Sequence, residues 1–244
     1  GRCPGPVVIS GRTSHRPAVP APSAICTGRR DLRRLTLDGV QRIPIFPLSA
    51  VLLPSGFLPL QLFEDRYRQM ILDLLEGDRE FGVVLIRRGN EVGGGEERCA
   101  VGTRARVVEA RQEPDGRWLV LAVGLERFRV RSWLPDDPYP WAEVVPMPDP
   151  PGPQIGESAY IDLVKAVRRL LAGLSELGEP VSEATFDVAD DPVLGIMQLA
   201  TVAPLGPHDR QCLLECGRVA ERFAFLCEFV SEAQKTANRR LAGT

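Results

Sequence analysis

The sequence predicts an α+β fold, in which a small β-barrel with one inserted helix is followed by a helical bundle. Short strand-like segments separated by turn residues fill most of residues 41–146, a spacing that is typical of barrels. A single amphipathic segment interrupts them at residues 64–76. From residue 155 onward the apolar residues recur at helical spacing instead. We expect the barrel to be closed or half closed.

The first 40 residues differ in composition from the rest. They contain five prolines and seven arginines, with Asp31 and Asp38 as the carboxylates and no apolar periodicity. This composition predicts a disordered, basic tail over residues 1–40. Since the whole chain has a net charge of −2 and the tail carries +5, the remaining residues carry −7. An acidic folded part is a poor surface for phosphates, which argues against nucleic acid as a partner.

The composition is that of a soluble globular protein, with 44% hydrophobic and 25% charged residues. No apolar run approaches the roughly 20 residues that a membrane helix needs, so we expect no membrane contact. The six cysteines show no paired spacing, and three of them (Cys212, Cys216 and Cys227) fall in one helical segment. Reduced thiols and a cytoplasmic location are therefore favoured over disulfides.

Two proline-bounded strands are predicted to open the barrel, at residues 42–46 and 58–62. A proline has no N–H group and a fixed φ, so prolines suit strand ends or edges rather than the middle of a sheet. The prolines in question are Pro44, Pro47 and Pro59. The helix at 64–76 has Glu64 in its first turn and is followed by Gly77, as is typical of helix ends.

Five further strands are predicted after this helix, at residues 82–87, 100–110, 117–125, 127–133 and 141–145. Two turn signals lie among them. Pro114-Asp115-Gly116 predicts a hairpin between the second and third of these strands, and Gly124-Leu125-Glu126 predicts another between the third and fourth.

The proline-rich residues 147–154 predict a stiff linker, and residues 155–244 predict a helical subdomain. Asp191-Pro192 is an N-cap followed by a first-turn proline, which predicts a helix up to about Val202. One long helix is predicted over 208–240. An earlier helix is indicated by an apolar stripe made of Tyr160, Leu163, Val164, Val167, Leu171 and Leu174.

Five blocks of sequence, in this order, resemble the Lon substrate-binding domain family, the amino-terminal region of the ATP-dependent Lon proteases. The blocks are Ile43-Pro44-Ile45-Phe46-Pro47-Leu48, Leu58-Pro59-Leu60 with Phe63-Glu64-Asp65-Arg66-Tyr67, Phe81-Gly82-Val83-Val84-Leu85, Val101-Gly102-Thr103-Arg104-Ala105, and Gly116-Arg117 through Gly124-Leu125-Glu126-Arg127-Phe128. The resemblance implies a PUA-like pseudo-β-barrel followed by helices. It also implies a set of fold-defining residues: Pro44, Phe46, Pro47, Pro59, Phe63, Glu64, Arg66, Tyr67, Gly102, Gly124, Arg127 and Phe128.

The same resemblance implies a role in recognising unfolded or damaged polypeptides. A complete Lon protease would also need a phosphate-binding Gly-x-x-x-x-Gly-Lys-Ser/Thr loop and a Ser–Lys pair, and neither motif occurs in the sequence. We therefore expect the recognition part alone, without catalysis or a cofactor. Unfolded polypeptides are the expected clients, and an ATP-dependent protease is a candidate partner.

Two apolar groups are the predicted client-binding residues, because exposed apolar patches at turns commonly mark interaction sites. They are Val51, Leu52, Leu53 and Phe57 around one turn, and Trp133, Tyr139 and Trp141 near the end of the barrel. The alternative is that these side chains seal the barrel or contact the helical bundle. Addition of a client strand to an open sheet edge is a further possibility, restricted by the prolines.

Two other interpretations were weighed against this one. Arg127, Arg129 and Arg131 alternate along a strand, so an RNA-binding PUA-like module is the alternative function. A solvated outer face, balanced by Glu109, Glu126 and Glu143, is favoured because the fold is acidic and the basic residues are not interleaved with stacking aromatics. His208 and Cys216 are eight positions apart on a helix, about 12 Å along its axis, which is too far for one tetrahedral zinc ion. We therefore predict no metal site there, even with Cys212 between them.

Overall fold

The computed structural model describes residues 39–89, 95–152 and 154–242. Residues 1–33 and 34–244 separate into two units, and all the described residues belong to the second. The predicted basic tail falls almost entirely outside the described residues.

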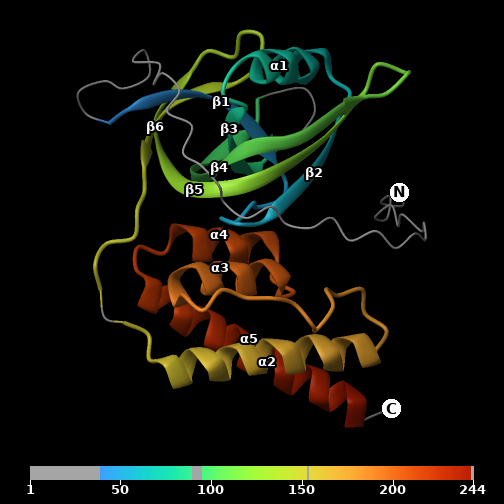
Figure 1. Ribbon diagram of the computed structural model, residues 1–244, viewed down its shortest axis with the longest axis vertical. Helices are drawn as coiled ribbons and strands as arrows, with labels where there is room; N and C mark the ends of the chain where they lie inside the picture. The colour runs from blue at the N-terminus through green and yellow to red at the C-terminus, as the bar shows by residue number, and fades with distance from the viewer. Residues whose placement is uncertain (1–38, 90–94, 153, 243–244) are drawn as a thin grey trace. The chain divides into compact units, whose positions relative to one another are not determined.

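A six-stranded sheet forms the first part of the described chain (Figure 1). Its strands lie in the order β2-β5-β4-β3-β1-β6, and β5 also pairs with β6. The sheet therefore curls back on itself, but it is not a closed barrel, because among the described strands β2 pairs with β5 alone. The α+β class and the incompletely closed barrel are as predicted. The strands are β1 Gln41–Leu48, β2 Phe57–Leu62, β3 Glu80–Arg88, β4 Glu97–Gln112, β5 Trp118–Leu134 and β6 Trp141–Pro146.

The predicted hairpin at Gly124-Leu125-Glu126 is wrong, because β5 runs through it without a turn. Opposite this point the register with β4 shifts by one residue, from Thr103 facing Arg127 to Ala105 facing Gly124. Gly124 therefore marks a β-bulge and not a turn, because a glycine inside a strand is typical of either feature. The hairpin at Pro114-Asp115-Gly116 is confirmed between β4 and β5.

Each of the three prolines lies where its strand has a single partner, in agreement with the prediction. Pro59 lies in the edge strand β2, as expected. Pro44 and Pro47 lie in β1, which has strands on both sides. They are tolerated because β6 pairs with Gln41–Pro44 and β3 pairs with Ile45–Leu48, so each half of β1 has a single partner strand.

Helix α1 (Asp65–Glu76) covers one opening of the sheet. Its buried residues recur at helical spacing and pack on sheet residues such as Phe46, Phe81 and Val107. The buried face of α1 consists of Tyr67, Met70, Ile71 and Leu74.

Helices α2 (Glu157–Glu176), α3 (Pro192–Val202), α4 (Pro207–Glu215) and α5 (Val219–Ala242) form the second part of the chain. The predicted apolar stripe of α2 is buried, and the Asp191 carboxylate accepts a hydrogen bond from the Val193 N–H at 3.2 Å, as an N-cap should. The single helix predicted over 208–240 is wrong. The backbone leaves the helix at Cys216, where ψ is 126°, and resumes it at Val219.

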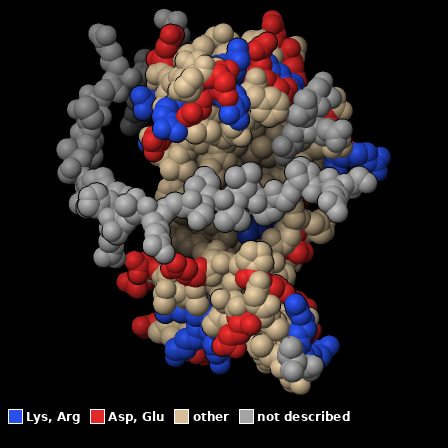
Figure 2. Space-filling model, turned by 90° about the vertical axis from the view of Figure 1, so that its right-hand side faces the viewer, with Lys and Arg blue, Asp and Glu red and all other residues tan. Residues whose placement is uncertain are grey.

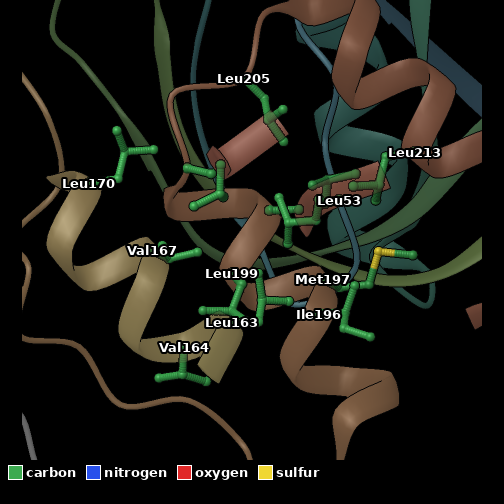
Figure 3. Close-up of a cluster of buried hydrophobic side chains, with 14 of the residues drawn as sticks. Leu53, Leu163, Val164, Val167, Leu170, Ile196, Met197, Leu199, Leu205 and Leu213 are labelled. Carbon is green, nitrogen blue, oxygen red and sulfur yellow. The ribbon is translucent and has the colours of Figure 1, made fainter. Parts of the chain in front are cut away.

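A core shared by the helices also takes in residues from the sheet part of the chain. Leu53, from the loop between β1 and β2, is 1% exposed and belongs to this cluster together with Val101 of β4. Figure 3 shows Leu53 among helical side chains that include Met197 and Leu213. The two parts of the fold are therefore joined by a common hydrophobic core.

Candidate functional site

The sheet leaves a groove where it fails to close, between the second half of β1 and the edge strand β2. This β1–β2 groove encloses about 310 Å³. One wall is formed by Phe46, Pro47, Leu48 and Ala50, and the other by β2 from Leu58 to Leu62. Phe63, Glu64 and Tyr67 close one end. The walls are mainly apolar, with Gln61 as the polar side chain of β2, so the groove is suited to hydrocarbon side chains.

Aromatic and charged groups hold the closed end of the groove. The ring centroids of Tyr67 and Phe46 are 4.3 Å apart. The Arg66 guanidinium lies 4.5 Å from the centre of the Tyr67 ring and forms an ion pair with Glu64 at 3.1 Å. These contacts hold the start of α1 against β1.

The Tyr67 hydroxyl is buried and has no hydrogen-bond partner among the described residues. Burial raises the pKa of this tyrosine to about 12. Burial is also the largest cause of the raised pKa values of Tyr139 and Tyr160. The sequence contains three tyrosines, so every phenol of the chain is affected.

We therefore expect the folded protein to resist phenol ionisation past pH ~10, where exposed tyrosines titrate. Because the fold favours the neutral phenols, this stabilisation is complete below pH ~10 and is lost as pH rises toward the folded pKa of Tyr67, about 12. Phenolate absorbance should appear together with the loss of the near-ultraviolet circular dichroism signal. Tyr67→Phe, which removes a buried hydroxyl, should move alkaline unfolding to higher pH. A phenolate signal centred near pH ~10 in a protein with native dichroism would contradict the prediction.

Two exposed phenylalanines mark the ends of β2. The side chain of Phe57 is 68% exposed and that of Phe63 is 57% exposed. Exposure of Phe63 corrects the expectation that it helps to define the fold: it precedes α1, whose first residue is Asp65, and so lies outside the buried helical stripe. A single exposed apolar side chain is ordinary on a protein surface, so these two matter because an apolar groove lies between them.

Gly102, Gly124 and Phe128 set how closely the strands and loops approach one another. A Cβ atom on Gly102 would lie 2.3 Å from the Val83 carbonyl oxygen, and one on Gly124 would lie 2.4 Å from the Leu53 carbonyl oxygen. Phe128 is fully buried and would also meet a Cβ on Gly102, at 2.8 Å. Side chains are therefore excluded at both glycines by packing.

A buried cluster of two arginines and one carboxylate connects the sheet to the helices. Arg127 of β5 donates hydrogen bonds to the carbonyl oxygens of Leu214 and Cys216, both at 2.8 Å. It thereby caps the carboxyl end of α4. Arg127 and the fully buried Arg222 of α5 both form ion pairs with Asp149. Burial, followed by the nearby Arg222 charge, lowers the pKa of Arg127.

Sequence comparison gives the family to which this architecture belongs. The profile of the ATP-dependent protease La (LON) substrate-binding domain matches residues 42–232. The chain belongs to this family. Lon protease 2 of Myxococcus xanthus is 27% identical over 203 residues, which cover 81% of this chain and 24% of that protein. The Lon protease of Anaeromyxobacter dehalogenans is 26% identical over 198 residues, which cover 79% of this chain and 23% of that protein. The chain thus matches about a quarter of the length of these relatives.

Solved structures agree with the fold of a Lon substrate-binding domain. The Lon N-terminal domain protein from Xanthomonas campestris has a TM-score of 0.58 and 24% identity, covering 77% of this chain and 98% of that one. The N-terminal domain of the Mycobacterium avium complex Lon protease also has a TM-score of 0.58, at 15% identity, covering 78% and 98%. At these identities the likeness concerns the fold.

The structure corrects the surface expected of this Lon substrate-binding domain at three predicted client-binding residues. Leu52, Leu53 and Tyr139 are 5%, 1% and 4% exposed, so they are core residues. Leu53 enters the helical core, and the Thr103 hydroxyl donates a 2.6 Å hydrogen bond to the Leu52 carbonyl oxygen. Val51 is partly buried against the same core. Both alternatives for this turn therefore apply: Val51 and Leu53 contact the helices, and Leu52 packs inside the sheet.

The predicted tryptophans lie in contact with arginines. The Arg42 guanidinium is 4.8 Å from the ring centre of Trp141, which also stacks on Tyr139 at 5.4 Å. Trp133 is 39% exposed, with Arg98 at 5.4 Å. Neither tryptophan lines the β1–β2 groove. Of the predicted client-binding residues, Phe57 is the one that is both largely exposed and adjacent to a residue that lines the groove, Leu58.

The arginines of β5 do not form one stripe. Arg127 is 5% exposed and holds the helices, whereas Arg129 and Arg131 are exposed. The sequence pattern missed this because the register shift near Gly124 buries two consecutive residues, Arg127 and Phe128. On the face shown in Figure 2, acidic side chains are interspersed among the basic ones.

Two further findings concern metals and membranes. Within the described ranges, no group of three or more His, Cys, Asp or Glu side chains could hold a metal ion. The His208 Nε2 and Cys212 Sγ atoms are 3.7 Å apart. None of the helices in the described part of the chain is both long and apolar enough to cross a bilayer.

Proposed function

We propose that this Lon substrate-binding domain binds segments of unfolded or damaged polypeptides in the β1–β2 groove, without catalysing a reaction. The observation that carries the proposal is a mainly apolar groove beside the open edge of β2, with exposed phenylalanines at both ends of that strand. Unfolded chains expose the apolar side chains that such a surface binds. A larger pocket between α2 and α5, of about 800 Å³, is lined in part by charged residues such as Asp162, Arg169 and Lys235. It is therefore less suited to apolar client side chains than the β1–β2 groove.

The relatives support a place for this binding in proteolysis. They are Lon proteases, and the matching family is named for substrate binding. We therefore propose that the bound polypeptides are substrates of an ATP-dependent protease. The described cysteines (Cys99, Cys212, Cys216 and Cys227) are free thiols, which fits a reducing, cytoplasmic compartment.

The groove can be tested with the double variant Phe57→Ser, Phe63→Ser. The client is a fluorescently labelled, carboxymethylated globular protein, which stays unfolded, and binding is followed by fluorescence anisotropy. Full burial of one phenylalanine contributes ~1.5–3 kcal/mol and ~1.4 kcal/mol corresponds to tenfold in Kd. We expect the double variant to bind at least ~10-fold more weakly.

The matched control is Leu72→Ser. Leu72 is 45% exposed on α1 and does not line the groove, so its replacement should leave Kd unchanged. Equal binding by the double variant and the unmodified protein would show that the client does not bind in the β1–β2 groove. Absence of binding to the unfolded client, together with salt-dependent binding to a structured RNA, would replace the proposal with the RNA-binding alternative.

A further inference from the structure

We propose that the open edge of β2 binds its client as an added antiparallel β-strand, bonded to the backbone groups of Phe57, Pro59 and Gln61. This inference rests on the proposed function and specifies the form in which the polypeptide is bound. The client is an extended segment with apolar side chains at every second position.

The pairing of β2 with β5 determines which backbone groups face the open edge. The Gly124 N–H donates to the Gly56 carbonyl oxygen at 2.8 Å, and the antiparallel register continues from Phe57 opposite Val123 to Leu62 opposite Trp118 without a shift. Hydrogen-bonded pairs alternate in an antiparallel ladder. Leu58, Leu60 and Leu62 therefore bond to β5, whereas Phe57, Pro59 and Gln61 direct their backbone groups to the open edge.

The β4–β5 hairpin gives the same alternation independently. The Glu113 N–H donates to the Arg117 carbonyl oxygen at 2.8 Å, and Gln112 stands opposite Trp118. By alternation, Arg117, Leu119 and Leu121 bond to β4. Residues Trp118, Val120 and Ala122 therefore bond to β2, where their partners are Leu62, Leu60 and Leu58.

The backbone of Pro59 therefore faces the open edge, and its lack of an N–H removes no hydrogen bond between β2 and β5. Pro47 does the same on the facing wall. The Ile45 N–H donates to the Pro140 carbonyl oxygen at 2.8 Å, on the β6 side of β1, so Pro47, two residues later, also faces away from β3. With an N–H absent from both facing edges, β1 and β2 are poor partners for each other.

An extended client is a better partner for β2 than β1 is, because it supplies its own donors. The edge offers the carbonyl oxygens of Phe57, Pro59 and Gln61 as acceptors, and the N–H groups of Phe57 and Gln61 as donors. None of the side-chain or loop hydrogen bonds found among the described residues uses these groups. Strand addition of this kind derives affinity from main-chain bonds and specificity from alternate side chains.

The faces of β2 define the side chains that the client needs. Leu58 and Leu60 are half-buried and Leu62 is buried, whereas Phe57, Pro59 and Gln61 are on the exposed face. Residues opposite each other in a sheet share a face. Client residues opposite Leu58 and Leu60 therefore lie on the groove side and should be apolar, with N–H groups that point away from β2. The residues between them donate their N–H groups to β2.

The decisive experiment uses a labelled peptide of alternating valine and threonine, long enough to span β2, in three forms. One form is unmodified, one is N-methylated at the threonines and one at the valines. The valines occupy the groove side, so methylation of threonine nitrogens removes the bonds to β2 and should weaken binding at least ~10-fold. Methylation of valine nitrogens should change Kd less than ~3-fold. Equal effects of the two modifications would overturn strand addition while leaving polypeptide binding intact.

A variant of the protein tests the same edge from the other side. Gln61→Pro removes one of the two N–H donors, and Gln61→Ala keeps it. We expect the proline variant to bind the unmodified peptide ~3- to 10-fold more weakly than the alanine variant, with native circular dichroism in both. Equal binding by the two variants would contradict the inference. If the unmodified peptide and the unfolded client both fail to bind, the proposed function itself fails.

Discussion

Replacing Arg127 with alanine is expected to lower the free energy of unfolding by about 3–5 kcal/mol, the cost of breaking a buried ion pair from one side. The change removes two 2.8 Å hydrogen bonds to the carbonyl oxygens that end α4, so Leu214 and Cys216 lose their donor. It also leaves Asp149 with Arg222 as its remaining buried partner. Urea denaturation followed by circular dichroism measures the effect.

Arg129→Ala is the matched control, because Arg129 is an exposed arginine two positions along the same strand. We expect it to change the free energy of unfolding by less than ~0.5 kcal/mol. If both substitutions have equally small effects, Arg127 does not anchor the helices to the sheet.

Replacing Gly102 with alanine is expected to destabilise the protein by about 3 kcal/mol or more, at the upper end of the range for an overpacked core. The new Cβ would lie 2.3 Å from the Val83 carbonyl oxygen and 2.8 Å from Phe128 and Val84 side-chain atoms. The backbone oxygen belongs to β3, which pairs with β4 at this point and cannot move without breaking the ladder. Thermal and urea unfolding should both show the loss.

Gly173→Ala provides the opposite expectation within the same chain. Gly173 lies inside α2, and the atoms nearest to a Cβ added there would be 3.8 Å from it, which is ordinary van der Waals contact. Alanine in a helix interior is favoured over glycine by ~0.5–1 kcal/mol, so this variant should be more stable than the unmodified protein. A Gly102→Ala protein that is as stable as Gly173→Ala would show that the sheet can relax around a methyl group.

The sequence predicted elements whose signals are local. The Asp191-Pro192 start of α3, the buried stripe of α2 and the turn at Asp115-Gly116 were correct because capping, periodicity and turn chemistry act within a few residues. The family resemblance added the class of fold, and the comparison with known proteins confirmed it.

Local signals were misleading where distant residues decide the outcome. Gly124 looked like a turn residue, but the Leu53 carbonyl oxygen, which approaches from another loop, requires the glycine. The end of α4 at Cys216 depends on Arg127 in β5. No window of sequence contains both partners, so the last helix appeared continuous.

The candidate site was predicted in part for the same reason. Leu52 and Leu53 are as apolar as Phe57, and only the placement of the two cores shows that Leu52 is buried in the sheet, Leu53 is buried among the helices and the phenylalanine is exposed. The groove itself could not be predicted, because it arises from a sheet order that places β1 and β2 at a gap.

The pairing of β1 has a consequence for the protein during its own synthesis. Gln41 pairs with Val144, on the order of 100 residues later, so the first half of β1 stays unpaired until the ribosome has released β6. The carbonyl oxygens that accept hydrogen bonds from Arg127, at the end of α4, are synthesised later still. Long-range pairings of this kind slow folding and leave edges exposed to association. The nascent chain therefore presents, for a time, the extended apolar segments that its finished fold is proposed to bind.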